Sequence, residues 1–129
     1  MKIIATDKAP QAIGPYSQAI AHMGVLYCSG QIALGADGSD HTQADVQTQT
    51  RIALENLKAV LHAGGSSLEN VLKVSIFLVD MDDFQQVNEV YASFFSQHRP
   101  ARACVAVCTL PKNASVEIEC IAAVVEATT

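Results

Sequence analysis

Residues 45–79 read DVQTQTRIALENLKAVLHAGGSSLENVLKVSIFLV, and this stretch joins a helical pattern to a strand pattern. From Asp45 to Ala63, apolar side chains recur at the three- and four-residue spacing of a helix, and a Gly-Gly pair then ends it. The segment Val71–Val79 is apolar and rich in β-branched residues, which predicts one central strand buried on both faces. A helix that leads into such a strand predicts a domain in which helices pack on a sheet.

The segments on either side supply the remaining elements of the predicted fold. Extended runs predict two hairpins, turn-forming residues predict a loop, and apolar spacings of three or four predict a second amphipathic helix. The positions are a first hairpin of Tyr16–Ala21 and Val25–Ser29, a loop over Leu34–Gln43, a helix from Asp80 to about Gln97, and a final hairpin of Arg102–Thr109 and Ser115–Ala127. This order predicts an α+β fold, with two helices packed on one face of a mixed sheet.

The composition indicates one globular domain spanning residues 1–129. Half of the residues are hydrophobic and only 16% are charged, so the chain can bury a substantial core. Eight Lys and Arg stand against 13 Asp and Glu, which gives a net charge of -5, and the basic residues form no cluster of three or more. Because nucleic-acid binding depends on cations that neutralise phosphates, the sequence predicts no nucleic-acid partner.

Neither a leader nor a membrane anchor is indicated by the sequence. The amino-terminal segment lacks the apolar core of a signal peptide, and no stretch approaches the roughly 18 apolar residues that span a bilayer. These features predict a cytoplasmic protein without membrane contact. The four cysteines and four histidines lack the spacing of metal ligands, so no metal site is expected.

Charged side chains interrupt the last two predicted strands. Alternate residues of a strand share a face, so Arg102 shares its face with Cys104, while Glu117 and Glu119 head an otherwise apolar face. Unpaired charges are costly to bury, and two interpretations remain open. In the first, the charges are ordinary strand-end charges in water. In the second, they form a recessed site, where an arginine binds a ligand carboxylate and a glutamate of raised basicity acts on a water molecule.

The first predicted hairpin has unusual residues at both ends. Gly14 and Pro15 restrict the backbone so that Tyr16 is presented at a defined point, and Ser29 precedes Gly30, which lets backbone N–H groups approach a ligand closely. The alternatives are an aromatic side chain at the edge of the core and an ordinary bulge at a strand end.

These interruptions resemble the motifs of the Rid family, also known as the YjgF family. The matching segments run in the same order along nearly the whole chain. They are APQAIGPYSQA at 9–19, SGQI at 29–32, VNEVY at 87–91, PARACV at 100–105 and LPKNASVEIE at 110–119. Because several separate motifs agree, the chain is identified as a member of this family.

The resemblance implies a chorismate-mutase-like α+β fold in a homotrimer, with ligand clefts between subunits. It implies hydrolysis of the imine or enamine of a 2-oxo acid, such as 2-iminobutanoate or 2-iminopropanoate, to the 2-oxo acid and ammonia, without a cofactor. By position, Arg102 would bind the substrate carboxylate and Glu117 would act on the water. The remaining cleft positions fall on Tyr16, Ser29, Gly30, Asn88 and Cys104, and the cysteine is expected to line the cleft rather than act as a nucleophile.

Other functions remain open within the same resemblance. One is a pathway-specific deaminase of another enamine, such as aminoacrylate or 2-aminomuconate. Others are a non-catalytic 2-oxo-acid binder, a chaperone-like binder, and a translation inhibitor with ribonuclease activity. The loop between Phe95 and Arg102 is shorter than in some family members, which bears on the size of the preferred substrate.

Overall fold

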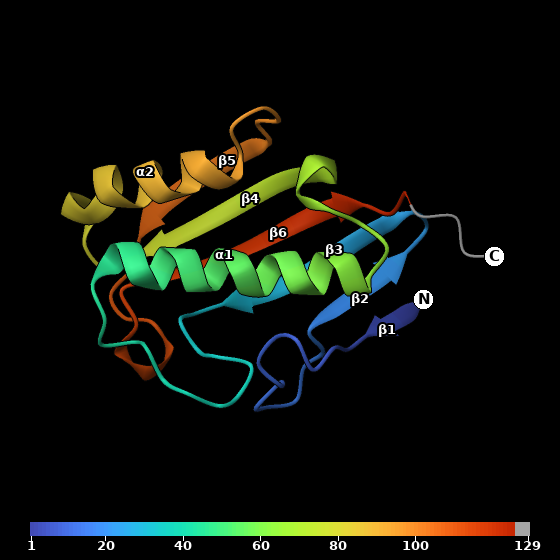
Figure 1. Ribbon diagram of the computed structural model, residues 1–129, viewed down its shortest axis with the longest axis horizontal. Helices are drawn as coiled ribbons and strands as arrows, with labels where there is room; N and C mark the ends of the chain where they lie inside the picture. The colour runs from blue at the N-terminus through green and yellow to red at the C-terminus, as the bar shows by residue number, and fades with distance from the viewer. Residues whose placement is uncertain (126–129) are drawn as a thin grey trace.

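The computed structural model describes residues 1–125, and its centre is a six-stranded sheet with two helices on one face (Figure 1). The strands are β1 Lys2–Ile4, β2 Ala19–His22, β3 Val25–Gln31, β4 Val71–Leu78, β5 Ala101–Ala106 and β6 Val116–Ala123, and the helices are α1 Val46–Ala63 and α2 Phe84–Phe94. The predicted α+β class, with both helices on one face, is confirmed. The last predicted run, Ser115–Ala127, extends past residue 125, so its final two residues lie outside the described part.

The sheet has the strand order β1-β2-β3-β6-β4-β5, which differs from the prediction at one end. The predicted final hairpin is wrong, because β4 lies between β5 and β6 and pairs with both of them. Strand β5 runs parallel to β4, as a crossover through α2 requires, while β6 is antiparallel to both of its neighbours. The sheet is therefore mixed, as predicted. Its parallel pair is formed by β4 and β5, which are distant in sequence.

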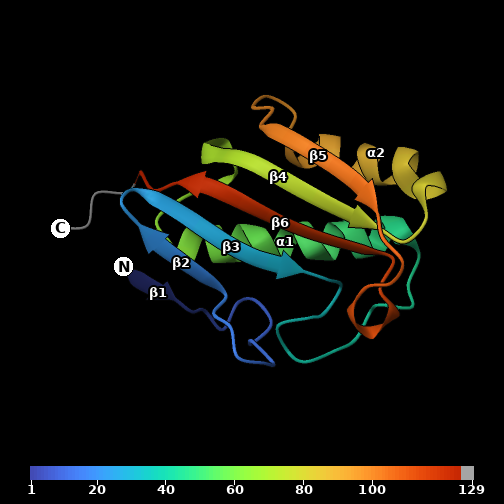
Figure 2. The ribbon, with the colours of Figure 1, turned by 180° about the vertical axis from the view of Figure 1, so that it is seen from behind.

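The two faces of the sheet differ in what covers them. Val74, Ile76 and Leu78 of β4 point toward the helices and are buried. The opposite face carries no helix (Figure 2), and there Lys73 is exposed and Phe77 only partly buried. The prediction that this strand is buried on both faces is therefore wrong for a single chain. We call this uncovered side, which includes Tyr27, Phe77, Val105, Glu117, Glu119 and Ile121, the open face.

Helix α1 begins and ends where the sequence predicts. The Asp45 carboxylate accepts hydrogen bonds from the Thr48 backbone N–H at 3.3 Å and the Thr48 hydroxyl at 2.6 Å, which caps the first turn. Gly64 ends the helix, and a Cβ there would lie only 2.8 Å from Cδ1 of Leu26 on β3. The helix is therefore held tightly against the sheet at its carboxyl end.

Buried Gln49 connects this helix to the start of β6. Its side-chain amide donates to the Ala44 carbonyl at 2.7 Å, and its side-chain carbonyl accepts the Ser115 N–H at 2.9 Å. A buried amide with both groups bonded is stabilising, and loss of either partner is costly. The connection fixes the position from which Glu117 projects, two residues farther along the chain.

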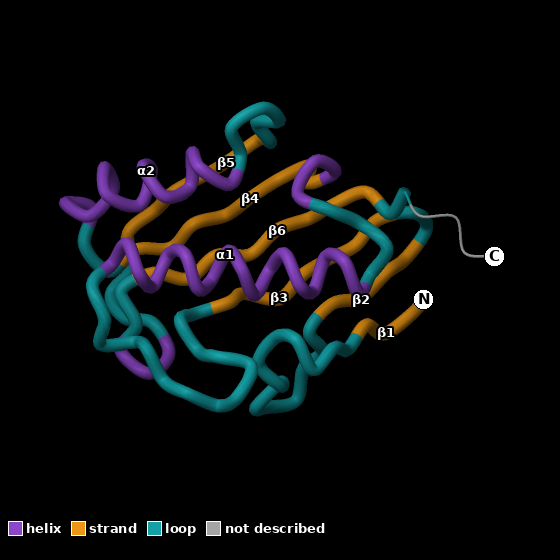
Figure 3. The backbone as a smooth tube through the Cα atoms, in the orientation of Figure 1, coloured by secondary structure: helices purple, strands orange, loops and turns teal. Residues whose placement is uncertain are grey.

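The first predicted hairpin is confirmed as β2 and β3, with a tight turn at Met23-Gly24 where both φ angles are positive. Its first strand begins only at Ala19, because residues 5–18 form a loop instead (Figure 3). Buried Gln18 holds that loop, since its amide donates to the carbonyls of Thr6 and Pro10. The predicted loop over Leu34–Gln43 is also present, and it lies beside this loop.

Candidate functional site

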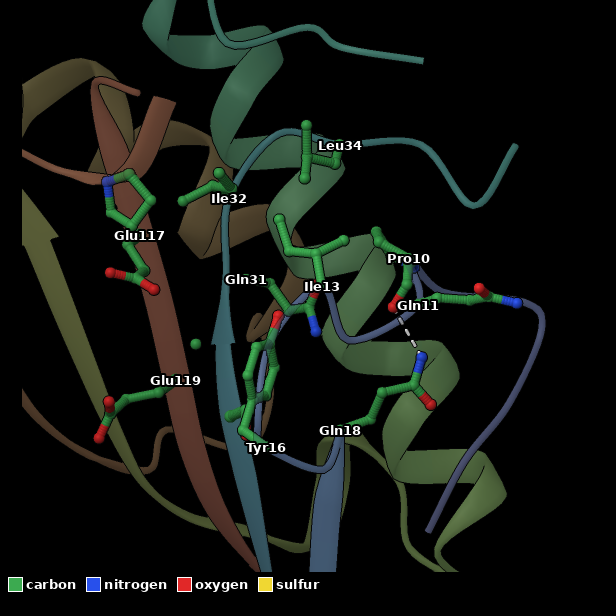
Figure 4. A pocket seen from close by; sticks show the side chains of 13 residues that line it. Pro10, Gln11, Ile13, Tyr16, Gln18, Gln31, Ile32, Leu34, Glu117 and Glu119 are labelled. Carbon is green, nitrogen blue, oxygen red and sulfur yellow. Dashed lines mark hydrogen bonds between the residues drawn. The ribbon is translucent and has the colours of Figure 1, made fainter. Parts of the chain in front are cut away.

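A cavity of about 470 Å³ lies where the loop of residues 10–16 meets the ends of β3 and β6 (Figure 4). Four of the sequence-predicted site residues line it, namely Tyr16, Ser29, Gly30 and Glu117. Glu119 lies on the same side of β6, and Ile13, Ile32 and Leu34 supply apolar wall. We call this space the Glu117 cavity.

The Glu117 side chain is half buried in this cavity. Burial raises the pKa of its carboxyl group, and the nearby charge of Glu119 raises the pKa further. The resulting carboxylate is more basic than one on the surface. Gly30 makes room for it, because a Cβ at that position would lie 2.9 Å from Cδ of Glu117. Any larger residue at position 30 would push the carboxylate away.

Hydrogen bonds fix Ser29 at the wall of the Glu117 cavity. The Ser29 hydroxyl donates to the Ser17 carbonyl at 2.6 Å, and the Ser29 N–H donates to the Gln18 carbonyl at 2.9 Å. These bonds use both donors of the serine, so its hydroxyl oxygen is what remains for a ligand. Tyr16, the residue directly before Ser17, is half exposed and lines the cavity.

Arg102 and Asn88 line a second cavity, of about 610 Å³, between α2 and β5. The Arg102 Nη1 group donates to Oδ1 of Asn88 at 2.6 Å. The guanidinium carbon also lies 4.8 Å from the ring centroid of Tyr91 and 5.6 Å from that of Phe84. The arginine is therefore held in one orientation although it is exposed. We call this space the Arg102 cavity.

Cys104 shares the helix-covered face of β5 with Arg102, as strand alternation predicts. Burial raises the pKa of its thiol, and the nearby Arg102 charge lowers the pKa by less. The thiol therefore stays protonated near neutral pH, which is the less reactive form of a cysteine. Cys104 lines neither of the two cavities.

The two cavities lie on opposite faces of the sheet within one chain. Arg102 is paired with Val74, on the face under the helices, whereas Glu117 is paired with Phe77, on the open face. Strand β4 separates the strands that carry them. One chain therefore does not bring Arg102 and Glu117 to the same small ligand.

The sequence prediction did not include the two aromatic side chains beside Arg102. Phe84 and Tyr91 are among the apolar residues whose spacing predicts the second helix. They lie four residues before and three residues after Asn88, so all three share one helix face. A polar residue flanked in this way on an apolar helix face is a signal that could have indicated a bound cation.

Among residues 1–125 there is neither a cluster of metal ligands nor a membrane-spanning helix. No three His, Cys, Asp or Glu side chains of residues 1–125 lie close enough together to hold a metal ion. Neither helix of that part combines the length and hydropathy that crossing a bilayer requires.

Residues 6–124 match the family model described as Endoribonuclease L-PSP. The chain belongs to this family. Membership confirms the resemblance to Rid and YjgF proteins that the motifs indicated. The chain is 47% identical to a RutC family protein of Pyrococcus horikoshii, over 94% of this chain and 96% of that protein.

Two other similar proteins carry names that mention a ligand or a reaction. The 2-iminobutanoate/2-iminopropanoate deaminase of Mus musculus is 44% identical, over 94% of this chain and 90% of the mouse protein. The crystal structure of E. coli TdcF with bound serine has a TM-score of 0.90 and 44% identity, and the match covers 95% of this chain and 98% of that one.

Proposed function

We propose that this protein hydrolyses short-lived 2-imino acids, such as 2-iminobutanoate and 2-iminopropanoate, to 2-oxo acids and ammonia. The main support is the half-buried Glu117 of raised pKa in a cavity large enough for a small acid and a water. A basic carboxylate beside a bound water is the arrangement that general-base hydrolysis needs. The name of the mouse relative and the serine bound to TdcF are consistent with a ligand of this class.

The proposed reaction needs orientation and one proton acceptor. Arg102 binds the substrate carboxylate through two parallel hydrogen bonds, which fixes C2 beside the water. Glu117 takes a proton from the water as the water oxygen adds to C2. The C=N double bond becomes a C–N single bond, and its electron pair moves to nitrogen. Glu117 passes this proton to nitrogen, which becomes an amino group. The new hydroxyl then gives up its proton, which Glu117 transfers to the nitrogen as the C–N bond breaks, so the ketone forms and ammonia is released.

The same proposal requires a homotrimer, in which the Arg102 cavity of one subunit meets the Glu117 cavity of the next. Two features support it. Arg102 and Glu117 lie on opposite faces of one chain, and the open face leaves apolar side chains in water, with Tyr27 48% and Val105 47% exposed. An apolar surface of this kind is typical of a subunit interface.

A coupled assay tests the proposed activity directly. A threonine dehydratase generates 2-iminobutanoate continuously, and 2-oxobutanoate is measured with and without this protein. We expect the 2-oxo acid to form faster when the protein is present, and heat-denatured protein to have no effect. An identical rate in both arms would contradict the proposal. Repeating the assay with imines of other side chains distinguishes a general deaminase from one specific for aminoacrylate or 2-aminomuconate.

The ribonuclease alternative has less support, although the family description names an endoribonuclease. The net charge is -5, and the charged residues that line the Glu117 cavity are the two glutamates Glu117 and Glu119. Such a surface repels a phosphate backbone rather than neutralising it. A small carboxylic acid, bound through one arginine, fits the charge distribution better.

Mixing two inactive variants tests whether the site is shared between subunits. Arg102→Ala and Glu117→Gln chains, co-expressed with different tags and purified through both, are expected to regain activity. In a cyclic trimer that contains both kinds of chain, one of the three clefts combines an intact arginine with an intact glutamate, so activity should approach about a third of wild type. Each variant alone is the control. Mixed trimers, identified by native mass spectrometry, that stay inactive would place the complete site within one chain.

A further inference from the structure

Three side chains from one face of α2 hold the guanidinium group of Arg102. Asn88 accepts a hydrogen bond from Nη1 at 2.6 Å, while the rings of Tyr91 and Phe84 lie 4.8 and 5.6 Å from the guanidinium carbon. Tyr91 is the nearer ring, and the distance is in the range of a cation–π contact. An arginine side chain has many rotamers in water, so these contacts select one of them before a ligand binds.

The Tyr91 ring is itself fixed in place. The residue is only 8% exposed, and its ring packs against Phe95 with 4.8 Å between centroids. Its hydroxyl group is buried, and within residues 1–125 it has no hydrogen-bond partner. Burial raises the pKa of this phenol, so the ring stays neutral. The hydroxyl therefore contributes no bond to the fold, and the useful part of the side chain is the ring face beneath Arg102.

We propose that Tyr91 is a positioning residue, whose ring face holds the Arg102 guanidinium in the orientation that receives a substrate carboxylate. This inference rests on the proposed function only for its effect on turnover. Asn88 uses one N–H of the five that a guanidinium carries, so the stacked group keeps a free edge for a bidentate contact. A platform that orders the arginine beforehand lowers the entropy lost on binding.

Kinetics of Tyr91 variants test the proposal. Tyr91→Leu removes the ring, and we expect KM for the imine to rise about 5- to 30-fold, the range of a partly desolvated cation–π contact, with kcat changed less than about twofold. Tyr91→Phe keeps the ring and is expected to retain the wild-type KM within about threefold. Phe94→Leu is the matched control, because it loses a partly buried aromatic ring of the same helix that does not contact Arg102.

Spectroscopy of Arg102 gives a readout that does not depend on catalysis. The chain has only three arginines, Arg51, Arg99 and Arg102, so ¹⁵N spectra of the side-chain Nε–H groups are simple, and Arg102→Lys assigns one signal. We expect the Arg102 signal to be shifted by the ring current and ordered in wild type and Tyr91→Phe. It should move to the position of an exposed arginine in Tyr91→Leu. If Tyr91→Leu does not fold, Phe84→Leu tests the second ring, with a smaller shift expected.

The outcomes separate this inference from the proposed function. A protein without deaminase activity, but with an Arg102 signal that depends on the ring at position 91, would overturn the function and leave the positioning role standing. A folded Tyr91→Leu variant with unchanged KM and an unchanged Arg102 signal would overturn the positioning role. A fall in kcat alone, with KM and the signal unchanged, would also overturn it, because that pattern reports a structural effect elsewhere.

Discussion

Replacing Arg102 by alanine is expected to abolish the acceleration of imine hydrolysis. The proposed substrate carboxylate forms two charge-assisted hydrogen bonds with this side chain, and each contributes about 1.5 to 3 kcal/mol. Losing both should lower kcat/KM at least about 100-fold, since about 1.4 kcal/mol corresponds to a factor of ten. The coupled dehydratase assay measures the change. Arg102→Lys should retain part of the activity, because lysine keeps the positive charge but cannot form the two parallel hydrogen bonds of a guanidinium group.

A matched variant controls for loss of positive charge. Arg51 is exposed on α1 and lines neither the Glu117 cavity nor the Arg102 cavity, so Arg51→Ala should keep the wild-type rate. Thermal unfolding of Arg102→Ala and wild type is compared to check that the variant still folds and assembles. Both proteins are used at the same concentration, because the unfolding temperature of an oligomer depends on concentration. A folded Arg102→Ala protein with the wild-type rate would rule out this arginine as the carboxylate-binding residue.

The parts of the fold that depend on neighbouring residues could be predicted from the sequence. Helix α1 follows from its apolar spacing, the Asp45 cap and the glycine at its end. The first hairpin follows from the tight turn at Gly24, whose φ is +80°. The pairing of β4 with β5 and β6 could not be predicted, because it is set by packing between strands far apart in sequence.

Some features of the candidate site could be predicted from the sequence, and others could not. Strand alternation correctly put Arg102 and Cys104 on one face, and motif resemblance supplied Asn88. Alternation cannot tell which face of a sheet the helices cover, so the sequence did not reveal that Arg102 and Glu117 face opposite ways. The contact between Tyr91 and Arg102 joins a helix to an edge strand, which periodicity alone does not detect.

Glu117→Gln is expected to lower kcat by about 100- to 10,000-fold, which is the usual contribution of a general base. The amide has the size of the carboxyl group but cannot accept the water proton. Because Arg102 and its cavity are unchanged, binding of 2-oxobutanoate, measured by calorimetry, should fall by less than tenfold. A non-catalytic 2-oxo-acid binder would give a different result, since its wild type would bind the ligand and show no turnover to lose.

The pH dependence of the wild-type enzyme gives an independent test of the same residue. A base works only when ionised, so kcat/KM should fall as the pH drops through the pKa of Glu117. Burial and the Glu119 charge both raise that pKa, and the acid limb should therefore lie above the pH range of an exposed glutamate. Glu119→Gln removes one of these causes and should move the limb to lower pH, with activity at neutral pH retained. In Glu117→Gln the residual activity should show no such limb. A limb that persists there unchanged would assign the titration to another group.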